Sequence, residues 1–264
     1  MSYFTILTVV DENTASTVTA HYAITLAASC KARLILYAVH ATGCHDVLID
    51  RTEVHLDHLQ AVSTGMSVPV TRITEIGNIR SLLPKRAEIE KADLVFYPIT
   101  PGERYGSKFK LHTVHHLLRT VTSDLAIMRA ITMGKPHPGN ILVPLGKVVS
   151  DDGRGLKFVA ELARSFHAQV TLFHLFDGEE TNVMPDDIIQ FGKKLQLQDV
   201  FVLERGGRGQ LGKSITVEAI TRRNDLIVIG TSGRGVLRRL FLSNPVSDVM
   251  HMPPCNVILF RLAC

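Results

Sequence analysis

Two turns near the end of the sequence carry the residue types that bind phosphate groups. Gly230 and Gly233 follow the apolar run DLIVI, and glycines in such a turn leave backbone N–H groups open to an anion. A helix then begins at Ser243, with Asn244 at its N-cap and Pro245 at its first position. Unpaired N–H groups and the positive end of the helix dipole favour an anion there. The two turns together predict a nucleotide site at the carboxyl end of a strand.

The spacing of these residues resembles the G-x2-G-x9-G-[ST] motif of the universal stress protein family. Gly230 and Gly233 match its first two glycines, and Ser243 and Asn244 stand at its last two positions. The resemblance implies ATP, with Mg²⁺, as the ligand. It places the phosphates on Gly230, Gly233, Ser243 and Asn244, with Arg234 as the nearest positive charge.

The resemblance also implies where the adenine ring would lie. In the second half of the chain, the ring would lie between the ends of the first two strands, near Pro144, Leu145 and Leu175. In the first half, Asp11 matches the acidic residue that family members place after their first strand to hydrogen-bond the nucleotide. Gly146 stands at the corresponding place in the second half, so each half keeps one part of a binding site.

The chain contains two copies of one design. Tyr3 to His40 pairs with Gly139 to Phe176 as strand, loop, helix and strand, and ADLVFYPITPG pairs with NDLIVIGTSGR. The stretch ITMGKPHPGN between the copies has the Gly and Pro expected of a linker. We therefore predict two universal stress protein-like domains, at residues 1–133 and 138–264.

The predicted fold class is α/β, with two tandem flavodoxin-like (Rossmann-like) domains. Continuous apolar runs such as ILTVV, LILYAV, LVFYPI and LIVIG indicate strands that are buried on both faces. Each domain is expected to be a five-stranded parallel sheet with helices on both faces. The resemblance further implies an intramolecular pseudo-dimer paired through residues 125–129 and 256–261, and the tandem chain could in addition form a homodimer.

A rival phosphate loop lies between Gly207 and Ser214, which satisfies G-x4-G-K-[ST]. In a P-loop, Lys213 would contact the β- and γ-phosphates and Ser214 would hold Mg²⁺. The run follows the third strand of its half, which the family topology puts at the sheet edge, whereas a P-loop follows a central strand. Separate replacement of Gly233 and Lys213 would distinguish the two loops.

No residue pattern predicts a metal centre or a catalytic nucleophile. Cys44, His45, His55 and His58 lack the tight spacing of zinc ligands, and a solvated helix face explains them better. The sequence also lacks a G-x-S-x-G elbow and an acid pair with an evident shared pocket. The expected activity is therefore at most slow ATP hydrolysis, which positioning and a metal ion can support.

The composition excludes several classes of protein. A net charge of +4 does not indicate a nucleic-acid partner, and the four scattered cysteines fit reduced thiols. The sequence shows neither a signal peptide nor an apolar run long enough for membrane insertion, which predicts a cytoplasmic protein.

A second interpretation uses no nucleotide. Ser243 and Asn244 replace the third glycine and the hydroxyl of the family motif, and the turn resembles divergent, transporter-linked copies of the family. The chain would then be an interaction or regulatory module for a transporter or a signalling protein.

Overall fold

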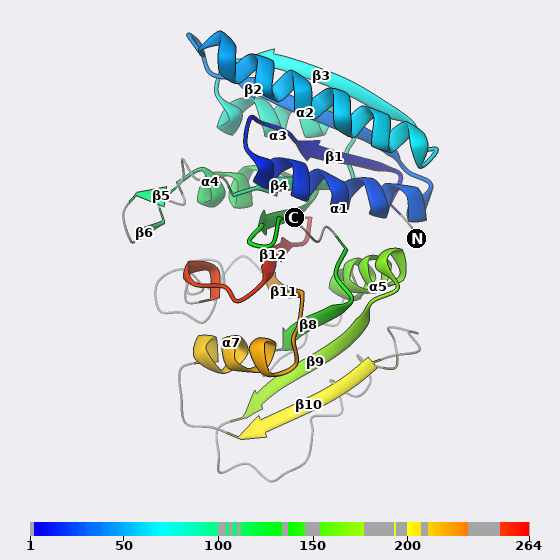
Figure 1. Cartoon of the computed structure of the whole chain (residues 1–264), viewed down its shortest axis with the longest axis vertical. Coiled ribbons are helices and arrows are strands. Elements are labelled where there is room, and N and C mark those ends of the chain that lie inside the picture. The colour runs from blue at the N-terminus through cyan, green and yellow to red at the C-terminus, as the bar shows by residue number, and fades with distance from the viewer. Residues whose placement is uncertain are drawn as a thin grey trace. The chain divides into compact units, whose positions relative to one another are not determined.

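The computed structural model of this chain describes residues 3–99, 104–105, 108–109, 112–133, 137–145, 154–176, 193, 200–206, 211–231 and 249–263. The chain divides into two compact units, the first made of residues 1–136 and 261–264 and the second of residues 137–260. Each unit is built on a mostly parallel sheet with α-helices between its strands (Figure 1). The α/β fold class predicted from the apolar runs is confirmed.

The first unit alternates strands and helices along the chain. Its main elements are β1 (Thr5–Val9), α1 (Thr14–Cys30), β2 (Arg33–His40), α2 (Asp46–Gly65), β3 (Val70–Ile76), α3 (Ile79–Ile89), β4 (Leu94–Pro98), α4 (His112–Thr120) and β7 (Asp124–Arg129). Two short strands, β5 (Arg104–Tyr105) and β6 (Lys108–Phe109), form a separate antiparallel pair.

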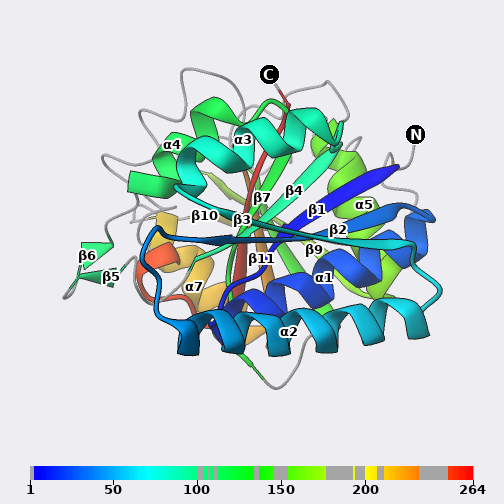
Figure 2. The same cartoon turned by 90° about the horizontal axis from the view of Figure 1, so that it is seen from above.

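The strand order of the first unit is β7-β4-β1-β2-β3, and these strands pair in parallel. Helices α1 and α2 cover one face of this sheet, and α3 and α4 cover the other (Figure 2). Every residue of β1 and β4 is buried, as expected for central strands covered on both faces. By contrast, β3 lies at the edge, and none of its residues is fully buried.

The second unit repeats this arrangement. Its elements are β8 (Asn140–Leu145), α5 (Arg154–Phe166), β9 (Gln169–Phe176), β10 (Val200–Gly206), α7 (Leu211–Thr221), β11 (Leu226–Thr231) and β12 (Asn256–Arg261). The strand order is β10-β9-β8-β11-β12, with β8 parallel to both β9 and β11. Both units therefore have the order 3-2-1-4-5, which is the order found in dinucleotide-binding sheets.

The helices of the two units also end in the same way. Lys31 after α1 and His167 after α5 adopt left-handed backbone conformations, with φ of 55° and 51°. Lys91 after α3 and Arg223 after α7 do the same, with φ of 51° and 54°. The two sequence copies thus form matching local structures, even though lysine, histidine and arginine adopt this conformation less readily than glycine.

The last residues of the chain complete the first unit. The Arg261 guanidinium donates hydrogen bonds to the backbone oxygens of Val121 (2.6 Å) and Ser123 (3.0 Å). The buried carboxylate of Asp124 accepts hydrogen bonds from the Ala263 N–H (2.7 Å) and the Tyr3 hydroxyl (3.1 Å). Both ends of the chain are therefore tied to the start of β7.

Among the helices that the structure describes, none combines the length and the apolarity needed to cross a lipid bilayer.

Candidate functional site

The carboxyl ends of the strands in the second unit form its candidate site, which we call the second-unit edge. Here β8 ends at Leu145, and its two neighbours β9 and β11 end at Phe176 and Thr231. These strands run parallel, so their carboxyl ends meet at the same edge of the sheet. After β10 the chain crosses to the other side of β8 to form β11, and open parallel sheets bind ligands at such a reversal point, here between β8 and β11.

Four of the predicted site residues lie on this edge. Pro144 and Leu145 end β8 and are half-buried, Leu175 is the residue before the end of β9, and Gly230 lies near the end of β11 and is exposed. The β8–β9 register sets Leu145 opposite His174, a buried residue whose Nδ1 lies 3.4 Å from the Leu145 oxygen. The edge therefore offers a half-buried apolar surface on β8, beside an exposed glycine on the neighbouring strand.

Gly230 does not need to be glycine for its own conformation. It lies within β11, and its φ is outside the left-handed region, so the tight turn expected at this residue does not begin there. A Cβ added at Gly230 would meet no heavy atom of the described structure within 4 Å. Among the described residues, nothing fills the place of the missing side chain, so another molecule can approach the backbone closely there.

The remaining predicted phosphate ligands, Gly233, Arg234, Ser243 and Asn244, lie outside the described residues. Gly146, which stands in the place of the family's acid, also lies outside them.

Asp11 lies in the other unit, directly after β1 at the carboxyl edge of the first sheet. Its Oδ1 accepts a hydrogen bond from the Asn13 N–H (2.9 Å), and its own N–H donates to the Ser16 hydroxyl (3.1 Å). The Asp11 backbone oxygen accepts from Nδ1 of His55 on α2 (2.8 Å). Burial raises the pKa of the Asp11 carboxyl, although the Asn13 hydrogen bond acts in the opposite direction.

The rival phosphate loop begins at an edge strand. β10 is the last strand in the order of the second unit, whereas ligands of such sheets bind at the reversal point between β8 and β11. Lys213 is exposed and Ser214 is half-buried, both in the first turn of α7. Gly207 lies outside the described residues. The topology therefore favours the second-unit edge over this loop.

Two of the three histidines considered as zinc ligands, His55 and His58, make other contacts. His55 donates to Asp11, and the His58 ring meets that of His21 on α1 with centroids 5.8 Å apart. Within the described ranges, no group of three or more His, Cys, Asp or Glu side chains is arranged to hold a metal ion.

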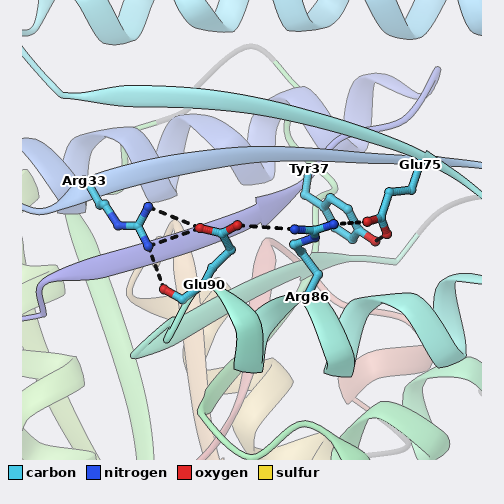
Figure 3. Close-up of polar contacts among 5 residues, drawn as sticks. All are labelled: Arg33, Tyr37, Glu75, Arg86 and Glu90. Carbon is cyan, nitrogen blue, oxygen red and sulfur yellow. Dashed lines mark hydrogen bonds and ion pairs between the residues drawn. The ribbon is translucent and has the colours of Figure 1, made fainter.

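An ionic cluster that was not predicted from the sequence joins α3 to the sheet of the first unit. The cluster consists of Arg33, Tyr37, Glu75, Arg86 and Glu90 (Figure 3). Glu75 accepts a hydrogen bond from the Tyr37 hydroxyl (2.6 Å) and pairs with Arg86, and Glu90 lies 3.3 Å from both Arg86 and Arg33. Aligning the charged residues of the two sequence copies could have pointed to it.

The cluster changes the pKa values of its members. The Tyr37 hydrogen bond, followed by the Arg86 hydrogen bond, lowers the pKa of Glu75. Burial, followed by the Glu75 hydrogen bond, raises the pKa of Tyr37. The Tyr37–Glu75 hydrogen bond between β2 and β3 contributes to both shifts, so we assign the cluster to stability rather than to the candidate site.

Comparisons with known proteins agree with this fold. The sequence model of the universal stress protein family matches residues 138–261. Among curated proteins, no relative of the chain was found. The solved structure of a universal stress protein from Archaeoglobus fulgidus is 14% identical, covers 98% of this chain and 96% of that chain, and has a TM-score of 0.71.

Two further solved structures match almost the whole chain. A putative universal stress protein from Pseudomonas aeruginosa is 14% identical, with 98% of this chain and 93% of that chain covered and a TM-score of 0.62. The cytoplasmic domain of a prokaryotic cation chloride cotransporter is 8% identical, with coverages of 100% and 96% and a TM-score of 0.63. Similarity at these identities is evidence for the fold alone.

Proposed function

Because the sequence model of the universal stress protein family matches residues 138–261, we propose that the chain is a stress-response regulatory protein whose second unit binds an adenine nucleotide. The observation that carries this proposal is the second-unit edge. Half-buried Pro144 and Leu145 lie there at the end of β8, and the exposed Gly230 lies on the neighbouring strand β11.

Each part of this edge suits one part of a nucleotide. The adenine ring would lie near Pro144, Leu145 and Leu175, because ligand sites combine apolar surface with a few polar backbone groups. The phosphates would approach the backbone at Gly230, where no side chain of the described residues stands in the way. In the sequence motif, Gly233, Arg234, Ser243 and Asn244 continue the phosphate site. ATP with Mg²⁺ is the ligand proposed.

Asp11 gives the first unit a separate feature of the family site. Its carboxylate is fixed by Asn13 beside the end of β1, where it can accept a hydrogen bond from an adenine or ribose group. We propose that this edge of the first sheet has a weaker affinity for nucleotide than the second-unit edge, since the turn after β4 lacks the glycine triplet.

The family resemblance also predicts how the chain assembles. The two units would pair as a pseudo-dimer, and the whole chain could form a homodimer.

Calorimetric titration of the whole chain with ATP and Mg²⁺ tests the proposal. Saturable heat at one site for each chain would support it, and a competing titration with adenosine would separate the adenine contribution from that of the phosphates. The absence of heat at millimolar ATP would reject the nucleotide site.

The alternative function is a nucleotide-free regulatory module. Two observations favour it: Ser243 and Asn244 replace the last two residues of the phosphate motif, and the cytoplasmic domain of a cotransporter shares the fold over the whole chain. In this case the chain would bind a membrane transporter or a signalling protein directly. Co-purification of one defined partner by a tagged chain that binds no ATP would favour this alternative.

A further inference from the structure

Helices α3 and α7 occupy equivalent places in the two units, and their residues can be matched through the backbone. Both helices have 11 residues and lie between the third and fourth strands of their unit. The N–H of Glu90 bonds the Arg86 oxygen at 3.0 Å, and the N–H of Arg222 bonds the Glu218 oxygen at 3.0 Å. Arg86 therefore corresponds to Glu218, and Glu90 corresponds to Arg222.

This correspondence reverses the sign of both charges. In α3, Arg86 pairs with Glu90 one turn later, at 3.3 Å. In α7, Glu218 pairs with Arg222 one turn later, at 2.6 Å, and the Glu218 residue is only 1% exposed. An i,i+4 ion pair is thus kept in both copies, but with the acid and the base exchanged.

A third charge, on the third strand of each unit, also has opposite signs in the two units. The β2–β3 register sets Glu75 opposite Val39, and the β9–β10 register sets Arg205 opposite Leu175. Val39 and Leu175 are the residues before the ends of β2 and β9, so Arg205 holds the strand position of Glu75. The order acid, base, acid in the first unit becomes base, acid, base in the second.

We propose that this reversal assigns each helix to its own sheet during folding, α3 to β2 and β3 and α7 to β9 and β10. Tandem copies of one fold are prone to misassembly, because an element of one copy can dock on the other. Apolar contacts discriminate poorly between similar surfaces, and selectivity usually needs a repulsive element. If α3 docked on the second sheet, it would bring Arg86 to the strand that carries Arg205. Two like charges would then meet, which is unfavourable.

The test exchanges the charges in the full-length chain. The double variant Glu218→Arg/Arg222→Glu gives α7 the charge order of α3, while β10 keeps Arg205. Adding Arg205→Glu gives a triple variant whose three charges copy the first unit. A matched control, Arg86→Glu/Glu90→Arg, makes the corresponding exchange in α3. Hydrogen–deuterium exchange reports the protection of each helix separately.

We expect the double variant to lose protection in α7 and the triple variant to regain it. Because the triple variant has two identical charge patterns, its refolding from urea should give more aggregate than wild type as protein concentration rises. Wild-type protection of α7 in the double variant, or no recovery in the triple variant, would overturn the pairing of helix and strand. If the triple variant regains protection in α7 but refolds with no more aggregate than wild type, the proposed role in folding fidelity is overturned. If the double variant is insoluble, the protection of α7 in the triple variant still tests whether the charges of α7 pair with the charge on β10.

Discussion

Asp93 and Asp225 perform the same role in the two units. One carboxylate oxygen of each accepts hydrogen bonds from two consecutive backbone N–H groups at the start of the unit's first strand. The donors are Phe4 and Thr5 at 2.8 and 2.9 Å in the first unit, and Gly139 and Asn140 at 2.9 and 3.1 Å in the second. The fourth strand is thus joined to the first in the same way in both copies.

Removing either carboxylate should destabilise its own unit. Asp93→Ala or Asp225→Ala leaves two backbone N–H groups without their acceptor, and we expect a loss of about 2 kcal/mol in the free energy of unfolding. Asp93→Asn and Asp225→Asn are the matched controls, because the amide oxygen can accept the same two bonds. Urea unfolding measures the loss, and equal stability of the alanine and asparagine variants would contradict this role.

Tyr37→Phe should lower stability mainly at neutral pH. The Glu75 pKa is lowered in the folded state, so its contribution to stability is present above the unfolded pKa and is lost as pH falls through the folded value. Without the Tyr37 hydroxyl, we expect a loss of about 1–2 kcal/mol that shrinks in acid. Urea midpoints measured from neutral to acid pH check this, and a loss that does not change with pH would refute it.

Asp11→Asn should stabilise the first unit at neutral pH. Because burial raises the folded pKa of Asp11, ionisation lowers stability as pH rises from the unfolded to the folded pKa. The asparagine can still accept the hydrogen bond from the Asn13 N–H but has no charge to desolvate. The advantage of the variant should therefore grow with pH across this interval and then stay constant. An advantage that falls as pH rises would contradict the pKa shift.

Deleting residues 261–264 should loosen β7, although these residues are the furthest from β7 in the sequence. The deletion removes the Arg261 donor to Val121 and Ser123 and the Ala263 donor to Asp124. Faster hydrogen exchange in residues 124–129 is expected, since the strand loses bonds at its start. Arg261→Lys is the milder comparison, because lysine keeps the charge but not the forked geometry of the guanidinium. Unchanged exchange in the deletion variant would show that the tail does not stabilise the strand.

Much of the fold could be predicted from the sequence, because buried parallel strands require continuous apolar runs such as ILTVV and LIVIG. The repeat could also be recognised in the sequence, but its alignment was one residue off at the start. The equivalent hydrogen bonds to Asp93 and Asp225 show that Phe4, rather than Tyr3, corresponds to Gly139. The roles of Asp93 and Arg86 could not be predicted, since each depends on a partner distant in sequence whose position only the strand register sets. Asp93 and Asp225 do occupy the same position in the aligned runs ADL and NDL, and this match could have indicated a shared role.

The reason for Gly230 also required the structure. A glycine after an apolar run is typical of a turn, yet Gly230 lies within β11, and no heavy atom in the described part of the chain lies within 4 Å of where its Cβ would be. Gly230→Val should therefore keep the fold and reduce ATP affinity by about tenfold or more, because the side chain would occupy the space proposed for the phosphates. Gly65→Val is the control, since Gly65 also has open space but ends α2 in the other unit. Equal ATP affinity of the two variants would contradict this placement.

The nucleotide content of the purified chain, released by denaturation and separated by anion-exchange chromatography, tests the proposed nucleotide site most directly. We predict an adenine nucleotide in wild type and in Gly65→Val that is lost in Gly230→Val. No nucleotide in wild type, together with no heat on titration with millimolar ATP and Mg²⁺, would contradict the nucleotide site and favour the regulatory module.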